Sequence, residues 1–248
     1  MSNIIYFPKE KQQLMPLFGG AFIENKPIPF PEAFSSQAYS SLFYWAHLEA
    51  NETSEFPLHP HKGFEIMTFI FEGSLEHYDT ATKVWTPLNA GGAQAIQANS
   101  GVYHAERITK GSRLFQIWFD PGFSKSMKML PLYKDYQYNS FEKKNINNID
   151  TIEYVGENGS IDSITEGLSI KKMDVKRGKL SIMIKPTSTY SFYLLEGAMR
   201  INNENIEKDG FLIIKDETEL ALYVQKSSEL FMIETPTAIS YKRYIDRM

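Results

Sequence analysis

The stretch HPHKGFEIMTFIFEGSLEHYD, from His59 to Asp79, shows the pattern that decides the fold. Residues 64–71 form a mostly apolar run, and a Glu-Gly pair separates this run from a second, alternating one. Short runs divided by turn residues indicate antiparallel strands joined by hairpins, rather than helices. The stretch therefore predicts a strand, a tight turn and a returning strand.

The same texture continues along the chain. Further short runs rich in apolar residues lie at 92–98, 114–119, 180–184, 192–195, 211–214 and 220–224. Gly, Pro, Asn and Asp lie between them, and short strands at such spacing predict a sandwich or barrel. Short helices are expected only near Phe30–Tyr39 and in the middle of the chain.

An internal sequence repeat indicates two related domains. The sequence FIFEGSL at 69–75 resembles YLLEGAM at 193–199, and each copy lies within a comparable series of predicted strands. The repetition favours an all-β fold of two tandem jelly-roll-type barrels. We place an N-terminal barrel at residues 1–135 and a C-terminal barrel at 136–248.

Composition excludes several classes of function. Among the 248 residues there is no cysteine, which rules out disulfides, thiolate nucleophiles and cysteine-bound zinc or iron–sulfur sites. The formal net charge of -4 argues against direct nucleic-acid binding. No apolar run approaches the length of a membrane-spanning helix, and the N-terminus does not resemble a signal peptide. We expect a cytoplasmic protein with neither membrane nor nucleic acid as a partner.

Two short motifs carry metal-binding chemistry, His59-Pro60-His61 and His104-Ala105-Glu106. In a strand, residues i and i+2 project from the same face, so each motif presents two donor side chains together. If the two strands are neighbours, about 5 Å apart, the four side chains converge. Either motif alone arises often by chance, but the pair in a strand-rich chain favours a site for one transition-metal ion. Three imidazoles and a carboxylate suit Fe(II), with Mn, Ni, Cu, Co and Zn as alternatives.

Other candidates are weaker. Glu65 has the parity of the first motif and is either a fifth ligand or a partner of a ligand imidazole. His77 is expected to be structural or supporting, and His47 to pack among aromatic residues. Gln116 is either a cavity-lining residue or a satisfied core amide, and we expect the latter.

These segments resemble the pirin family of bicupins. The likeness lies in HPHKGFEIMTFIFEGSLEHYD (59–79), ANSGVYHAE (98–106) and LFQIWFDP (114–121), and it covers about residues 40–135. It implies two stacked cupin barrels, of which only the N-terminal one binds a metal, normally iron. The family's motif positions correspond here to His59, His61, His104 and Glu106.

The C-terminal half departs from the metal-site pattern, because it contains no histidine. Matching Glu196-Gly197 to Glu72-Gly73 places Met183 and Lys185 at the positions of the two HPH histidines. We therefore expect the second barrel to lack a similar metal site.

Two functions follow from the resemblance. The leading hypothesis is an Fe(II)-dependent quercetin 2,3-dioxygenase-like enzyme acting on a flavonol, with Glu106 as general base. The alternative is a non-enzymatic, iron-dependent redox sensor or transcriptional co-regulator that binds a protein partner. For the enzyme, the expected walls of the substrate cavity are Phe64, Met67, Phe69, Ile96 and Trp118.

Overall fold

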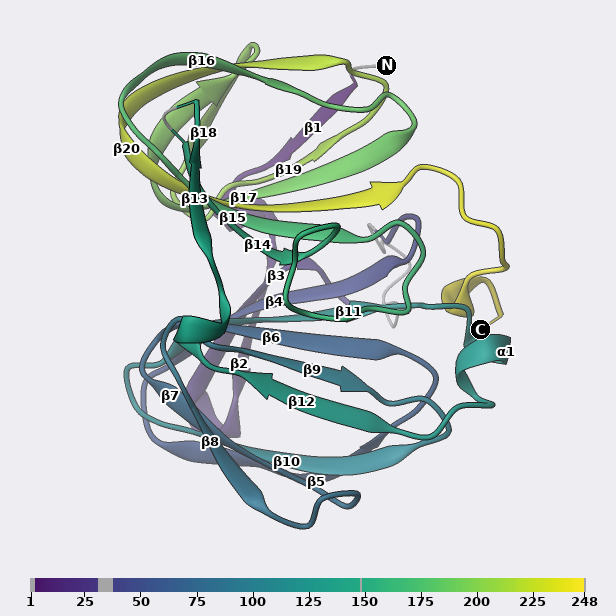
Figure 1. The fold of residues 1–248 in the computed structure, drawn as a ribbon. Coiled ribbons are helices and arrows are strands. Elements are labelled where there is room, and N and C mark those ends of the chain that lie inside the picture. Colours follow the sequence, from purple (N-terminus) through teal and green to yellow (C-terminus); the bar gives the residue numbers. More distant parts are fainter. Residues whose placement is uncertain (1–2, 31–37, 148, 248) are drawn as a thin grey trace. The chain divides into compact units, whose positions relative to one another are not determined.

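The computed structural model describes residues 3–30, 38–147 and 149–247, and it consists almost entirely of antiparallel strands (Figure 1). The predicted all-β class is therefore confirmed. Residues 31–37, on which one expected helix falls, lie outside the described residues. In mid-chain the structure has one short helix, α1 (Phe123–Ser126). The 3-10 turns are η1 (Lys9–Lys11), η2 (Phe18–Gly20), η3 (Tyr138–Ser140) and η4 (Tyr244–Arg247).

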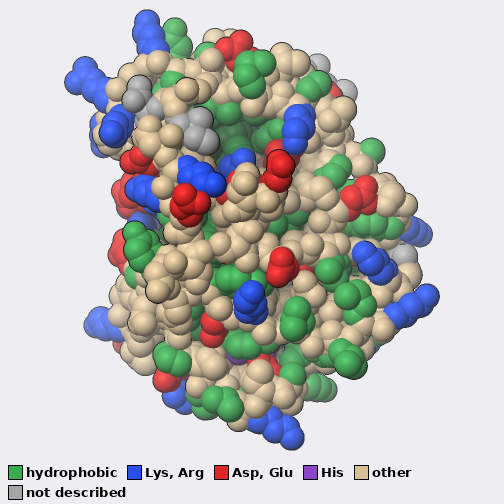
Figure 2. Space-filling model, in the orientation of Figure 1, with side chains coloured by type: hydrophobic (Ala, Val, Ile, Leu, Met, Phe, Trp, Pro, Cys, Tyr) green, Lys and Arg blue, Asp and Glu red, His purple; other side chains and the backbone are tan. Residues whose placement is uncertain are grey.

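The chain forms two compact units. The N-terminal unit comprises Gln13–Ser140, Ser163–Thr165 and Ser240–Met248, and the C-terminal unit comprises Met1–Gln12, Phe141–Asp162 and Glu166–Ile239. The division at residue 135 stays a prediction about separately folding domains. In the described parts of both units, no helix has the length and apolar composition needed to cross a membrane. Acidic and basic side chains are interspersed over the face shown in Figure 2.

The N-terminal unit packs a seven-stranded sheet on a four-stranded sheet. The larger sheet has the order β12 (Leu132–Tyr136), β9 (Ala93–Gln97), β6 (Glu65–Glu72), β11 (Arg113–Phe119), β4 (Leu42–Ala50), β3 (Phe22–Ile28) and β2 (Gln13–Leu17). The smaller has the order β5 (Ser54–His61), β10 (Val102–Ile108), β7 (Ser74–Asp79) and β8 (Trp85–Asn89). One hydrophobic cluster takes Phe22 and Ile70 from the larger sheet and Leu88 and Ile108 from the smaller. Alternating strands thus bury one face of each open sheet, as in a jelly roll.

The C-terminal unit is one nine-stranded sheet that curls around its own core. Its order is β1 (Ile4–Phe7), β19 (Phe211–Ile214), β17 (Ser188–Ile201), β20 (Glu219–Pro236), β15 (Ser169–Val175), β14 (Ile149–Val155) and β13 (Lys143–Ile146). Two more strands join it, β16 (Gly178–Met183) on β20 and β18 (Glu204–Glu207) on β17. Buried residues from most of these strands form one cluster, including Leu194, Ile201 and Leu230.

The two units repeat one pairing scheme. In the N-terminal unit β11 pairs with β4 and β6, while β10 pairs with β5 and β7. In the C-terminal unit, the second half of β20 pairs with β15 and with the first half of β17. The first half of β20 pairs with β16 and with the second half of β17. The long strand β20 therefore corresponds to β10 and β11 together, and the long strand β17 corresponds to β6 and β7 together.

The Glu-Gly turns repeat this likeness at the level of atoms. A Cβ on Gly73 would lie 2.2 Å from Ser112 Oγ, and one on Gly197 would lie 2.1 Å from Ser228 Oγ. Both glycines also have positive φ, 75° and 102°, which side chains disfavour. The same close contact in both units confirms the prediction of two related domains.

Candidate metal centre

The two histidine motifs lie on neighbouring strands. Strands β5 and β10 pair antiparallel, with His104 opposite His59 and Val102 opposite His61. This pairing confirms the expected adjacency. Between Phe56, opposite Glu106, and His59, β5 has one residue more than β10, which is a β-bulge. Because directly opposite residues share a face, His59 and His61 lie on the face that carries His104, and the bulge keeps Phe56 on this face as well.

The structure brings the predicted donor groups together around His104. Ligand atoms of His59, His61 and His104 all lie within 4.8 Å of one another, and so do those of His77, His104 and Glu106. The ring centre of His104 lies 4.3 Å from that of His59 and 4.9 Å from that of His61. Glu106 thus joins the cluster through His104, and His77 is an addition to the predicted set.

Several donor atoms in this cluster are buried without a hydrogen-bond partner among the described residues. They are Nε2 of His61, both ring nitrogens of His77 and of His104, and Oε1 of Glu106. A buried polar atom without a partner costs about 1–3 kcal/mol, so such atoms rarely gather without a reason. Nitrogen and carboxylate donors that converge in this way fit a transition-metal ion.

A backbone contact sets the orientation of His59, the most exposed of the four candidate ligands. Its Nδ1 lies 2.8 Å from the carbonyl oxygen of Pro57. Because a carbonyl oxygen only accepts, this bond requires a proton on Nδ1 and leaves the lone pair on Nε2. Ligand histidines are commonly held by such a bond.

Burial sets the charge state of the cluster. It lowers the pKa of His61 to about 3 and that of His77 to about 4, and it lowers the pKa of His104 well below its ordinary value. These imidazoles are therefore neutral at pH 7, the form that binds metals. Burial also raises the pKa of Glu106 to about 7, although a hydrogen bond from Gln116 acts in the opposite direction.

A chain of two hydrogen bonds holds the Glu106 carboxylate. Gln116 Nε2 donates to Glu106 Oε2 over 2.9 Å, and Trp118 Nε1 donates to Gln116 Oε1 over 3.1 Å. Because the indole N–H can only donate, it fixes the Gln116 amide with its NH₂ group toward Glu106. Gln116 is half-buried and lines the cavity, so the cavity-lining interpretation holds and the expected core position was wrong, although its amide is hydrogen-bonded.

A cavity of about 260 Å³ opens beside the cluster. Its lining includes His59, His61 and Glu106 together with Trp118 and Tyr44, whose rings are stacked 4.4 Å apart. The site thus joins metal donors to an aromatic surface.

Comparisons with known proteins identify relatives of this chain. Residues 27–119 match the family model described as Pirin. A "Putative quercetin 2,3-dioxygenase" of Pasteurella multocida is 30% identical over 187 residues, covering 72% of this chain and 76% of the relative. The chain belongs to the pirin family. A quercetin 2,3-dioxygenase of Escherichia coli is 24% identical to this pirin over 186 residues, 73% of this chain and 76% of the relative.

Solved structures show the same fold. The bacterial pirin YhhW of Escherichia coli in complex with nickel(II) superposes with a TM-score of 0.80 at 19% identity, covering 95% of this pirin and 100% of that chain. Oxalate decarboxylase of Lactobacillus farciminis, in a formate complex, gives a TM-score of 0.67 at 11% identity, covering 98% and 88% of the two chains. The predicted bicupin fold is therefore confirmed for this pirin.

The expected cavity walls were mostly wrong. Of the five residues predicted, only Trp118 lines the cavity, and Phe64, Met67, Phe69 and Ile96 do not. On β6 it is Thr68 that faces the cavity, so Met67 and Phe69 project from the opposite face.

The sequence analysis also missed a buried ion pair in the cavity wall of this pirin. Lys26 Nζ lies 2.8 Å from Glu24 Oε2, and both side chains are at most 10% exposed. The alternation in the strand sequence FIENKPI was a usable signal, because Glu24 and Lys26 share the parity of the buried Phe22.

Glu65 is bound by a distant loop. Its Oε2 accepts from Ser163 Oγ (2.6 Å), Thr165 N (3.1 Å) and Thr165 Oγ1 (2.5 Å), and its Oε1 accepts from Ile164 N (3.0 Å). Both oxygens are thus engaged outside the metal cluster. Burial raises the pKa of Glu65, while these hydrogen bonds lower it. In this pirin Glu65 anchors the loop, and the ligand interpretation is not supported.

The two histidines outside the predicted ligand set pack against aromatic rings. His77 stacks on Tyr133 with ring centres 4.2 Å apart, and its Nε2 lies 3.4 Å from Asp79 Oδ2. His47 packs edge-on against Phe115 at 5.1 Å, which confirms its expected aromatic environment.

Proposed function

We propose that this pirin is a metal-dependent oxygenase that cleaves a flavonol such as quercetin, with one Fe(II) ion held by His59, His61, His104 and Glu106. The observation that carries the proposal is the convergence of buried, unpaired nitrogen and carboxylate donors on the wall of a cavity. Relatives named as quercetin 2,3-dioxygenases support the substrate class, and the nickel(II) complex of the Escherichia coli pirin supports a metal ion.

The donor set supports the choice of ion. Neutral imidazoles and one carboxylate suit Fe(II) and its first-row neighbours, whereas Ca²⁺ and Mg²⁺ prefer more oxygen ligands. When bound, the metal would supply Lewis-acid binding of the substrate's hydroxyl and carbonyl oxygens.

Glu106 accepts the proton of the substrate hydroxyl in this proposal. Burial raises the pKa of metal-free Glu106 to about 7, which increases its affinity for a proton, and a bound cation would lower this pKa again. The bonds from Trp118 through Gln116 hold this carboxylate in one orientation. Glu106 is thereby ready to deprotonate a hydroxyl group that enters the cavity.

The cavity wall binds the rings of the substrate. The stacked pair Tyr44 and Trp118 provides an aromatic surface, and Leu48 and Leu114 extend it. The Glu24–Lys26 pair supplies polar groups for further hydroxyls. A volume of about 260 Å³ lies just below the usual range for ligand pockets, so it favours a small, flat molecule.

Dioxygen consumption and ring cleavage with quercetin test the proposal. Fe(II)-loaded protein is expected to turn over, and Glu106→Gln is expected to lose at least about 100-fold in kcat, within the range of general-base contributions. The exposed Glu52→Gln serves as the matched control. Absence of turnover on a panel of flavonols by fully metallated protein would overturn the oxygenase proposal.

Elemental analysis tests the ligand assignment separately. His104→Ala is expected to purify without stoichiometric metal, and an unchanged metal content would overturn the assignment. A metallated protein that is inactive on flavonols but binds a protein partner only in one iron oxidation state would favour the redox-sensor alternative.

A further inference from the structure

The C-terminal unit has apolar residues at the positions of the metal ligands. The two units correspond strand by strand. Glu72 lies opposite Arg113 in the N-terminal unit, and Glu196 lies opposite Glu229 at the matching place in the C-terminal unit. Counting along the paired strands from these anchors gives the counterparts of His59, His61, His104 and Glu106 as Ile182, Ile184, Leu220 and Leu222. These four side chains belong to or pack against the hydrophobic cluster of this unit.

This correspondence differs by one residue from the alignment made on the sequence, which gave Met183 and Lys185. The reason is the connection to the next strand, because three residues separate His61 from Glu65 whereas four separate Ile184 from Thr189, the counterpart of Glu65. The C-terminal unit has therefore replaced metal donors by apolar side chains.

A cavity nevertheless remains in the corresponding place. It measures about 530 Å³, roughly twice the volume beside the metal cluster. Six of its lining residues are counterparts of residues that line the N-terminal cavity, namely Thr151, Met173, Ile182, Ile184, Met232 and Glu234. The volume lies within the usual range for small-molecule sites.

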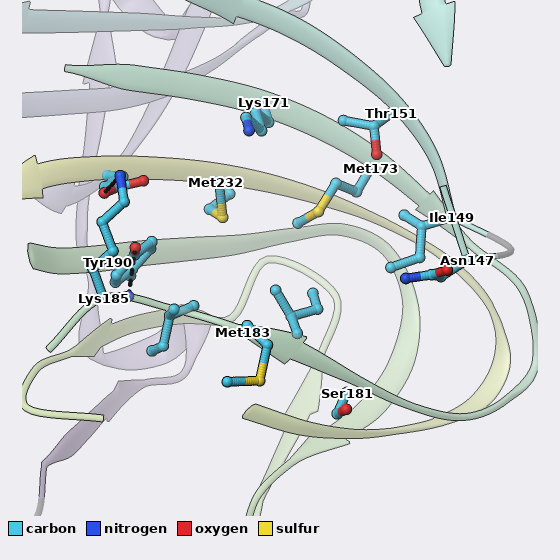
Figure 3. Close-up of a pocket in the computed structure, with 13 residues that line it drawn as sticks. Asn147, Ile149, Thr151, Lys171, Met173, Ser181, Met183, Lys185, Tyr190 and Met232 are labelled. Carbon is cyan, nitrogen blue, oxygen red and sulfur yellow. Dashed lines mark hydrogen bonds and ion pairs between the residues drawn. The ribbon is translucent and has the colours of Figure 1, made fainter. Parts of the chain in front are cut away.

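One end of this cavity is polar. Figure 3 shows Lys185 and Tyr190 together at this end, with Lys171 above the cavity. Lys185 Nζ lies 3.0 Å from Glu234 Oε1, which also accepts from Ser188 Oγ over 2.9 Å. The Tyr190 hydroxyl accepts from the backbone N–H of Lys185 over 3.0 Å.

Lys171 is the cation with donor capacity to spare. Its Nζ lies 3.7 Å from Glu153 Oε1, which is longer than a hydrogen bond. An ammonium group has three N–H donors. The lining contains two lysines and one glutamate, and Glu153 beside Lys171 balances the second lysine, so the unused N–H donors of Lys171, rather than a net charge, favour an acceptor group here. An acceptor group such as a carboxylate is the partner that fits this end.

The rest of the lining is apolar and adaptable. Met173 and Met232 are buried on the sheet, and Met183, which is 73% exposed, lies at the rim of the cavity on the strand across from them (Figure 3). Ile149 closes the end away from the lysines. Methionine side chains are flexible and polarizable, so they accommodate apolar groups of different shapes.

We propose that the C-terminal unit of this pirin binds a small amphipathic organic acid in this cavity without a metal. The carboxylate lies beside Lys171 and Lys185, and the apolar part lies on Met173, Met183 and Met232. This site is separate from the metal centre and does not depend on the proposed oxygenase activity.

Decanoate is a suitable probe, with methyl-¹³C-methionine labelling of the full chain as the readout. The expected result is a saturable shift of the methyl resonances of Met173, Met183 and Met232, assigned by single Met→Leu replacements. The affinity is expected to be the same with and without excess EDTA, which separates this site from the metal centre. Shifts confined to other methionines, or no shift at millimolar decanoate, would overturn the proposal.

Charge and shape are tested by variants. Lys171→Gln is expected to weaken decanoate binding about fivefold, a typical effect for a partly exposed ion pair, while the exposed Lys176→Gln has less than about a twofold effect. Binding of neutral 1-decanol is expected to be unchanged in Lys171→Gln. Ser181→Trp, at an exposed lining position, is expected to block binding. Equal losses in both lysine variants, or full binding by Ser181→Trp, would contradict the assignment.

Discussion

The hydrogen bond from Gln116 to Glu106 provides the sharpest test of the metal centre. Replacing Gln116 by Met keeps the length and apolar packing of the side chain but removes both of its hydrogen bonds. Among the described residues, no other hydrogen bond to the Glu106 side chain is present. The variant therefore leaves this carboxylate buried and without a fixed orientation.

The magnitude follows from this geometry. Removing a group that orients a metal ligand typically costs 10- to 100-fold in metal affinity, or about 1.4–2.7 kcal/mol. Because the Gln116 bond lowers the pKa of Glu106, the variant also raises that pKa above about 7. The fraction of deprotonated Glu106, which is the form that binds the metal, falls by a larger factor at pH 6 than at pH 8. The loss of affinity is therefore expected to be larger at pH 6.

Competition with a chromogenic chelator for Ni(II) measures this effect. Gln97→Met is the matched control, because Gln97 is buried in the same unit and does not line the cavity. Trp118→Phe is expected to cost less than Gln116→Met, since it retains the bond to Glu106. A Gln116→Met affinity within twofold of wild type, or a larger loss in Trp118→Phe, would refute the reasoning.

Three further predictions concern stability. Glu65→Gln places an amide where the carboxylate accepts four hydrogen bonds. In urea unfolding, the free energy of unfolding is expected to fall by about 2–3 kcal/mol in this variant, and by less than about 0.5 kcal/mol in the exposed control Glu52→Gln. Burial of Asp174 favours a higher pKa, but the bonds from Lys143 and Lys172 outweigh it and lower the pKa. The stabilisation by Asp174 is thus present above its ordinary pKa and is lost as the pH falls through the pKa of the folded state. Asp174→Asn is therefore expected to lower the free energy of unfolding by about 0.5–1 kcal/mol at pH 7 and by almost nothing near pH 2. A difference that does not change with pH would contradict this. Removing the metal with EDTA is expected to destabilise the protein by about 2.7 kcal/mol if the free metal had been at 100 times its Kd, and His59→Ala is expected to abolish this difference in thermal unfolding.

The sequence was informative where the signal is local. Two donors at i and i+2 share a face whatever the rest of the fold does, so the motifs at His59 and His104 could be predicted to point together. The Glu-Gly turns likewise indicated the duplication, because Gly73 and Gly197 make the same close contact with a serine.

The sequence was less informative where the chain changes direction. The turn at Lys62-Gly63-Phe64 lies between β5 and β6, so parity counted from His61 does not carry over to Glu65 or Met67. The loop that binds Glu65 is about 100 residues away along the chain. Likewise, β1 pairs with β19 across more than 200 residues. Such partners are chosen by tertiary packing, which single-sequence patterns do not record.

The shared register of the two ladders leaves the halves of this pirin alike in backbone at the ligand positions. Ile182 lies opposite Leu220 as His59 lies opposite His104, so histidines at Ile182, Ile184 and Leu220 and a glutamate at Leu222 would occupy matched ladder positions. Loss of the donor set from one half of a duplicated chain of this kind therefore needs changes of residue type alone, with no change in strand length.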